Sequence, residues 1–153
     1  MELIILKNKK KIVNVSIAAI ITALYVVLTY LASALGLASY AVQVRFSEAL
    51  TILPLFTPAA IPGLFAGCIL ANILTGALPM DILFGSIATL IGAVGTRLLR
   101  KHRILALLPP ILSNTLIIPF VLKFTYGIPG SVWYFMLTVG LGEVISCGVL
   151  GYL

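Results

Sequence analysis

The chain of 153 residues has few charged or reactive side chains. Only 9% of its residues are charged, and four are acidic. There is one histidine, His102. The two cysteines lie in separate apolar segments, at Cys68 and Cys147, and have neither a CxxC spacing nor the spacing of metal ligands. The motifs GxxxxGK[ST], HExxH and GxSxG are also missing. We therefore expect no enzyme activity, no metal site and no cofactor or ATP bound by this chain itself.

What the chain has in abundance is apolar sequence. Hydrophobic residues make up 61% of it, and its mean hydropathy is +1.21. About twenty apolar residues cross a bilayer, so the chain has room for about six spans and for no soluble domain beside them. We predict an all-α integral membrane protein with six transmembrane helices in a single domain, residues 1–153. Breaks at glycine, proline and charged residues place the helices near 12–36, 44–56, 58–76, 80–99, 104–124 and 131–153.

The basic residues gather in two clusters beside these apolar segments. One cluster, Lys7–Lys11, precedes the first segment, and the other, Arg97–Arg103, fills a single break. Basic residues flanking spans follow the positive-inside rule, which explains them better than nucleic-acid binding does. The first apolar stretch is too long for a signal peptide, so we expect it to be retained. We predict a multi-pass protein of the cell membrane, in contact with the lipid bilayer, with its N-terminus and both clusters in the cytoplasm.

Hydrophilic residues stand alone inside the apolar segments. An ionisable group at membrane depth costs roughly 2.5 kcal/mol or more, so it normally pairs with a neighbour or binds a ligand. Arg45 and Glu48 are three residues apart, which predicts either a local ion pair or a ligand site near the external loops. Glu143 either forms a hydrogen bond with Asn114 or Asn72, or has a role with a ligand or a proton.

Two further features have alternative explanations. Asp81 begins the fourth predicted helix, where it either caps the helix or contacts a ligand. Gly63 and Gly67 are four residues apart and let another helix approach closely. This face suggests an alternative function, a self-sufficient small oligomeric channel or secondary carrier for a polar solute. A membrane scaffold is a third possibility, but it would not need three intramembrane acids.

One long segment resembles the signature of the QueT family. Residues 45–63 read RFSEALTILPLFTPAAIPG. Further matches are Gly67–Asn72, Asp81 with Phe84-Gly85-Ser86, Pro109-Pro110 with Asn114, and Val139–Glu143, so that the resemblance covers nearly the whole chain. QueT proteins are small substrate-binding (S) components of energy-coupling factor transporters and are associated with the uptake of queuosine precursors.

The resemblance implies partners and an energy source. S components are six-helix proteins that bind a vitamin-like ligand externally and dock on one transmembrane T component with two ATPases, which use the ATP. An Ala-x-x-x-Ala motif on their first helix meets the T component, and Ala19 and Ala23 fit that motif. The chain departs from the family in its short 76–80 loop and in the absence of the expected cytoplasmic tail after Leu153.

The resemblance also implies a ligand chemistry. A deazaguanine-type precursor offers two adjacent N–H donors, which one carboxylate can accept together, and its aminomethyl form adds a cation. We expect Glu48 to accept the donor edge and Asp81 or Glu143 to meet the cation. The remaining predicted contacts are Arg45, which orients Glu48 or meets the ligand's carbonyl group, and the neutral amides Asn72 and Asn114.

Overall fold

The structure is a computed structural model that describes residues 2–37 and 44–151, with side chains from residue 5 onward. In that part of the chain all regular elements are helices, which confirms the predicted all-α membrane fold. In chain order they are α1 (Glu2–Ala34), η1 (Phe46–Leu55), α2 (Ala60–Leu74), α3 (Pro79–Leu98), η2 (Leu105–Leu107), α4 (Leu108–Phe124), α5 (Val132–Glu143) and η3 (Val144–Leu150). η2 runs directly into α4, and α5 runs directly into η3. The eight elements therefore form six continuous helical stretches.

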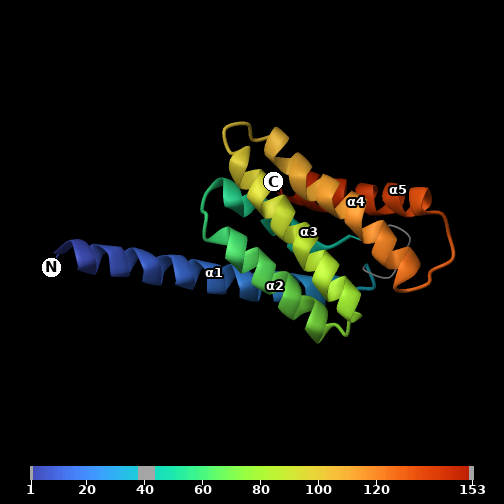
Figure 1. The fold of residues 1–153 in the computed structure, drawn as a ribbon, viewed down its shortest axis with the longest axis horizontal. Helices are drawn as coiled ribbons and strands as arrows, with labels where there is room; N and C mark the ends of the chain where they lie inside the picture. The colour runs from blue at the N-terminus through green and yellow to red at the C-terminus, as the bar shows by residue number, and fades with distance from the viewer. Residues whose placement is uncertain (1, 38–43, 152–153) are drawn as a thin grey trace.

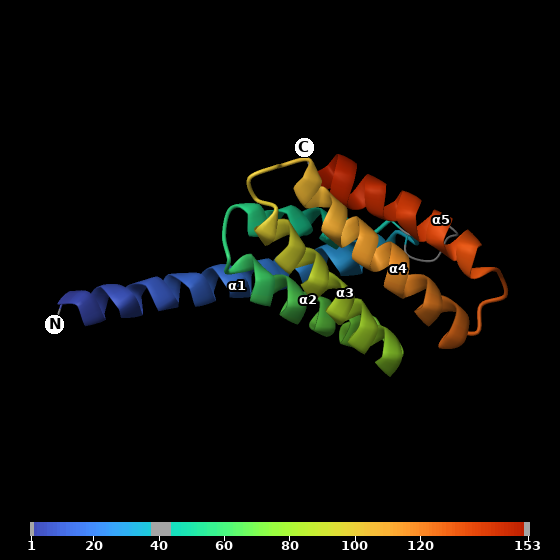
Figure 2. The ribbon, with the colours of Figure 1, turned by 45° about the horizontal axis from the view of Figure 1, so that its top comes forward.

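The stretches differ in length. Four are long and apolar enough to cross a membrane, namely Ile5–Ala34, Pro79–Leu98, Leu105–Phe124 and Val132–Leu150. The other two, η1 and α2, are shorter apolar helices of 10 and 15 residues. Successive stretches alternate in direction, so that η1 and α2 run alongside the longer helices (Figures 1 and 2).

Three elements differ from the predicted helices, each for a local reason. The first helix begins at Glu2 instead of residue 12, because the lysines before the apolar segment are themselves good helix formers. η1 is a 3-10 helix, and an α-helix here would bring the ring of Pro54 against a carbonyl group of the preceding turn. The last helix widens from α to π geometry at Val144, a change that hydropathy does not reveal.

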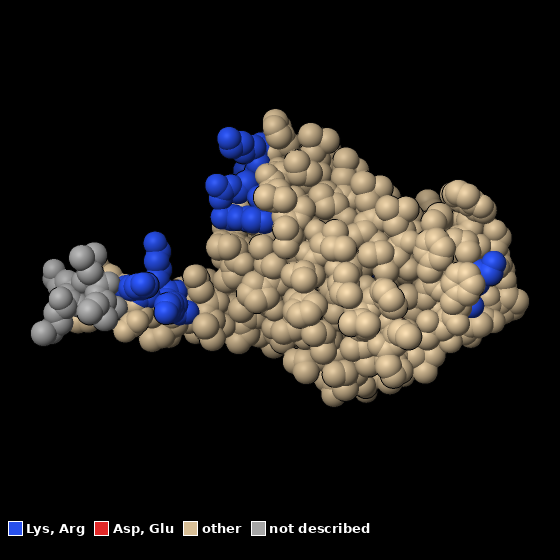
Figure 3. All heavy atoms as spheres, viewed as in Figure 1, with Lys and Arg blue, Asp and Glu red and all other residues tan. Residues whose placement is uncertain are grey.

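Both basic clusters lie at one end of the bundle, which we call the basic end. The N-terminal part of α1 projects beyond the other helices there, and the α3–η2 connection lies nearby (Figure 1). Figure 3 shows the Lys and Arg atoms of both regions toward this end, and no Asp or Glu atoms of the described side chains on the visible face. The acids Glu48, Asp81 and Glu143 are instead buried inside the bundle.

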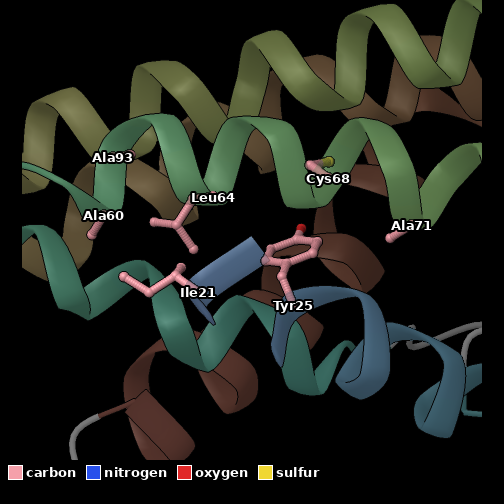
Figure 4. Packing of buried hydrophobic residues seen from close by; sticks show 7 residues of the cluster. All are labelled: Ile21, Tyr25, Ala60, Leu64, Cys68, Ala71 and Ala93. Carbon is pink, nitrogen blue, oxygen red and sulfur yellow. The ribbon is translucent and has the colours of Figure 1, made fainter. Parts of the chain in front are cut away.

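Close contact between α1 and α2 builds one half of the core. A Cβ atom on Gly63 would lie 2.8 Å from the carbonyl oxygen of Ala18, and one on Gly67 would lie 2.7 Å from Cβ of Tyr25. Figure 4 shows Tyr25 packed beneath α2, next to Cys68. The predicted close approach at this glycine face is therefore confirmed. The alternative of oligomerisation through the same face is wrong, because α1 of the same chain already covers it.

The other half of the core joins α3, α4 and α5. A Cβ atom on Gly92 would lie 2.7 Å from Cα of Pro110, so α3 and α4 also approach closely. Farther along, Ile118 of α4 packs with Phe135 and Val139 of α5. At the basic end, the Arg97 guanidinium donates to the carbonyl oxygens of Pro54 and Leu55 at 3.1 and 3.2 Å and thereby holds the end of η1.

Candidate functional site

A polar cavity of about 410 Å³ opens at the end of the bundle opposite the basic end. We call this the cavity end. The cavity lies among the end of α1, the start of η1, the α2–α3 turn and the loop after α4, and its lining includes Arg45, Asn72, Thr75, Asp81 and Tyr126. Its volume lies within the usual range for small-molecule sites, roughly 300–1,000 Å³. A polar lining inside an otherwise apolar protein indicates a polar ligand.

Asn72 is held in this cavity by the way α2 ends. Gly76 has a φ of 75°, a conformation that glycine adopts without strain. The N–H of Ala77 donates to the carbonyl oxygen of Asn72 at 2.9 Å. The N–H of Gly76 donates to the carbonyl oxygen of Ile73 at 3.1 Å. This is a Schellman motif, which satisfies the last carbonyl groups of the helix. The motif fixes the backbone of Asn72, whose buried side chain faces the cavity.

Asp81 enters the cavity from the first turn of α3. Its side chain is 7% exposed, and its Oδ2 accepts a hydrogen bond of 2.8 Å from the Tyr126 hydroxyl. That hydroxyl accepts one of 3.3 Å from the N–H of Leu78. Partial burial raises the pKa of Tyr126, as does its bond to Asp81, so the hydroxyl stays a donor at neutral pH. The second oxygen, Oδ1, is buried and has no hydrogen-bond partner within the described residues.

Glu48 lies in a separate, deeper cluster. Its side chain is 1% exposed. Its Oε1 accepts a hydrogen bond of 2.5 Å from the Tyr25 hydroxyl, and its Oε2 accepts one of 3.4 Å from the Asn114 amide. Both oxygens therefore have donors, as a buried carboxylate requires. Arg45 faces the cavity instead, and no ion pair joins it to Glu48 in the described part of the chain.

Glu143 belongs to the same deep cluster. Its Oε2 accepts a hydrogen bond of 3.2 Å from the Cys147 thiol, one turn farther along the chain. Side-chain oxygens of Glu48 and Glu143 and the Cys147 sulfur lie within 4.8 Å of one another, a grouping that could hold a metal ion. Two carboxylates this close repel each other when both are charged, so the cluster needs a shared proton or a cation.

The six predicted ligand residues thus form two groups. Arg45, Asn72 and Asp81 line the cavity, whereas Glu48, Asn114 and Glu143 form the deep cluster. The predicted docking residues Ala19 and Ala23 are exposed on α1.

Sequence reasoning missed three residues that donate side-chain hydrogen bonds to the buried acids, Tyr25, Tyr126 and Cys147. Tyr25 could have been suspected, because a buried tyrosine hydroxyl in an apolar helix normally needs a partner. Tyr126 lies in the loop after α4, and nothing in the sequence pairs it with Asp81, which is 45 residues away. Cys147 is four residues after Glu143, a spacing that places both on one helix face, yet a buried cysteine is ordinarily a packing residue.

A larger hollow of about 800 Å³ lies on the outside of α3 and α4. Its lining is almost wholly apolar and includes Met80, Phe84, Phe120 and Phe124. On the lipid-facing surface of a membrane protein such a hollow suits acyl chains. The polar cavity is the better candidate for a polar ligand.

Residues 15–153 match the family model described as QueT transporter. The chain belongs to the QueT transporter family. No curated protein and no solved structure matches it. As a QueT family member the chain is a multi-pass membrane transport protein, an S component that uses a small-molecule substrate.

Proposed function

We propose that this QueT family member binds a queuosine precursor of the deazaguanine type in the polar cavity. Uptake is driven by an energy-coupling factor module of one T component and two ATPases, because the chain has no nucleotide motif of its own. The observation that carries the proposal is the cavity itself, in which the free, buried Oδ1 of Asp81 lies near Asn72 and Arg45. An unpartnered acceptor in an apolar protein is costly unless a ligand supplies its donor.

The position of the cavity fits import. The positive-inside rule supports a cytoplasmic basic end, and the proposal accordingly has the N-terminus in the cytoplasm and the cavity end outside. A ligand would therefore enter the cavity from the exterior without crossing the bundle. The residues of the deep cluster are buried and do not line the cavity, although Glu48 lies in the first turn of η1.

The geometry favours Asp81 as the acid that meets the ligand. The sequence predicts Glu48 for the donor edge, but both Glu48 oxygens already accept hydrogen bonds from the protein. Asp81 lines the cavity and has an oxygen to spare. The guanidinium of Arg45, in the same lining, is suited to the ligand's carbonyl group or to balancing the Asp81 charge.

The test is calorimetric binding of the cyano and aminomethyl deazaguanine precursors to the purified protein. Asp81→Asn should weaken binding about ten- to a hundredfold, the equivalent of one charge-assisted hydrogen bond. Glu48→Gln is the matched comparison, since it changes a carboxylate that does not line the cavity. If Glu48→Gln greatly weakens ligand binding and Asp81→Asn does not, Glu48 and not Asp81 accepts the donor edge of the ligand. If the wild type binds neither precursor, the proposed ligand is wrong.

Docking on the T component is tested separately. Ala19→Leu and Ala23→Leu add bulk to an exposed small-residue face, so they should reduce co-purification with the ATPase module while ligand affinity is unchanged. Ala34→Leu is the control, because Ala34 is also exposed on α1 but lies near the cavity end. Intact assembly of both variants would show that this face is not the docking surface.

A further inference from the structure

The first helix continues beyond the rest of the bundle at the basic end. α1 has 33 residues and α3 has 20, so α1 is longer by about 20 Å at the rise of an α-helix. Figures 1 and 2 show its N-terminal part clear of the other described helices, and the side chains of residues 5–16 are all exposed. The hydrocarbon core of a bilayer is about 30 Å thick, so a helix as long as α1 reaches into the headgroup region.

One face of this projecting part combines basic and apolar side chains. Four residues at the spacing i, i+3, i+4 and i+7 share the face, namely Leu6, Lys9, Lys10 and Val13. We call it the Lys9–Lys10 face, and its side chains line a groove of about 460 Å³. Leu6 is 62% exposed and Val13 is 48% exposed, so apolar surface lies on both sides of the two lysines. The positive-inside rule explains at which end lysines occur, but it does not explain this order of side chains on one face.

The surroundings of this face are strongly positive. Figure 3 shows the second basic cluster across the step where α1 leaves the bundle. Glu48, Asp81 and Glu143 are buried inside the bundle, so none of these acids offsets the charge at the surface. The exposed cations of this end are Lys7, Lys9, Lys10, Lys11, Arg100, Lys101 and Arg103. A partner that fits this surface is therefore anionic.

The position of the face beside the membrane-spanning part of α1 favours a lipid. A helix longer than the hydrocarbon thickness tilts, and a tilt of α1 toward this side brings Leu6 as well as Val13 to the membrane surface. Lysine side chains lay their methylene groups along apolar surface and keep their ammonium groups in the headgroup region. An anionic phospholipid supplies both a phosphate for the lysines and acyl chains for the apolar residues, whereas a soluble anion supplies only the charge.

We propose that the Lys9–Lys10 face binds an anionic phospholipid at the basic end of the protein. The ammonium groups of Lys9 and Lys10 contact the lipid phosphate, and Leu6 and Val13 contact the glycerol and the upper part of the acyl chains. Clusters of basic residues next to a membrane span attract anionic lipids in this way. The inference goes beyond the proposed function and does not depend on it, because the polar cavity lies at the opposite end of the bundle.

The experiment is native mass spectrometry of the purified full chain, titrated with phosphatidylglycerol or phosphatidylcholine that carry the same acyl chains. The wild type should bind phosphatidylglycerol at least roughly tenfold more tightly, since each lysine at a membrane surface contributes about a fivefold preference for anionic lipid. Lys9→Gln should weaken phosphatidylglycerol binding about fivefold, and Lys9→Gln combined with Lys10→Gln should remove most of the preference. Lys123→Gln is the matched control, because it removes one positive charge from the last turn of α4, near the cavity end.

A second variant tests the apolar part of the contact. Leu6→Ser leaves every charge in place and removes apolar surface, so it should weaken binding of phosphatidylglycerol severalfold. Inorganic phosphate at millimolar concentration is the companion probe, because it matches the lysines but has no acyl chain. It should compete only weakly with phosphatidylglycerol for the wild type.

Three results would overturn the proposal. The first is equal affinity for the two lipids, or an unchanged preference when Lys9 and Lys10 are both replaced. The second is full competition by inorganic phosphate together with unchanged binding in Leu6→Ser, which would make this a phosphate site and not a lipid site. The third is a variant with both lysines replaced that keeps its lipid preference but no longer co-purifies with the ATPase module, which would show that the face docks an acidic protein surface.

Discussion

Replacing Tyr25 with phenylalanine tests how the deep cluster stabilises the bundle. The Tyr25 side chain is 2% exposed, and its hydroxyl donates to the carboxylate of Glu48, which is 1% exposed. Tyr25→Phe keeps the ring that packs against α2 and removes the donor alone. Water cannot easily replace that donor at this depth, so one Glu48 oxygen would lose its partner.

The size of the effect follows from the kind of bond. Hydrogen bonds to charged groups contribute about 1.5–3 kcal/mol, and an unsatisfied buried acceptor costs a similar amount. Tyr25→Phe should therefore lower the folded-to-unfolded ratio roughly ten- to a hundredfold. Tyr30→Phe is the matched control on the same helix, since Tyr30 is 62% exposed and the change should stay within about 0.5 kcal/mol.

The assay is reversible unfolding in mixed micelles, followed by far-ultraviolet circular dichroism. A double-mutant cycle with Glu48→Gln isolates the Tyr25–Glu48 pair from other effects of each change. Equal destabilisation in Tyr25→Phe and Tyr30→Phe, or a coupling energy near zero in the cycle, would refute the reasoning. Because Tyr25 does not line the cavity, ligand affinity should be unchanged in the folded variant.

Three further predictions concern other contacts and the orientation. Arg97→Gln should destabilise the protein by about 1–3 kcal/mol in the same unfolding assay, because it removes the donor that holds the end of η1, whereas exposed Arg100→Gln should have little effect. Gly67→Ala should lower the midpoint of thermal unfolding, since a Cβ atom 2.7 Å from its neighbour forces α1 outward at a cost of about 1–3 kcal/mol. In a cysteine-free background, a cysteine at Ile128 should react with an impermeant thiol reagent applied to intact cells, and one at Lys101 should react only after lysis; the reverse pattern would invert the proposed orientation.

The sequence predicted those features that depend on composition along one helix. Long apolar stretches separated by glycine, proline and charge were sufficient for the six helical stretches, and the spacing of Gly63 and Gly67 predicted the close approach of another helix. Which helix would approach was not predictable, because a stripe of small residues fits a neighbour in the same chain as well as one in another copy. The structure decides this by placing α1 over the stripe.

The division of the site residues was beyond sequence reasoning for a similar reason. Arg45 and Glu48 are three residues apart, so on a helix they would share one face and act together. In the structure, Glu48 instead accepts hydrogen bonds from Tyr25 of α1 and Asn114 of α4, which lie 23 and 66 residues away. Hydropathy marks an acid as buried without showing which donors surround it. The free oxygen of Asp81 is likewise a property of packing, since it depends on where Tyr126 and the α2–α3 turn come to lie.

The 3-10 winding of η1 gives this element a length that an α-helix would not have. Its 10 residues rise about 20 Å at 3-10 geometry, against about 15 Å in an α-helix. Arg45 at its start lines the cavity, and the carbonyl groups of Pro54 and Leu55 at its end are held by Arg97. If η1 became an α-helix, it would shorten by about 5 Å. Either Arg45 would then leave the cavity lining or the hydrogen bonds from Arg97 would break. The length of η1 therefore couples the position of Arg45 in the cavity to the position of Arg97 at the basic end of the bundle.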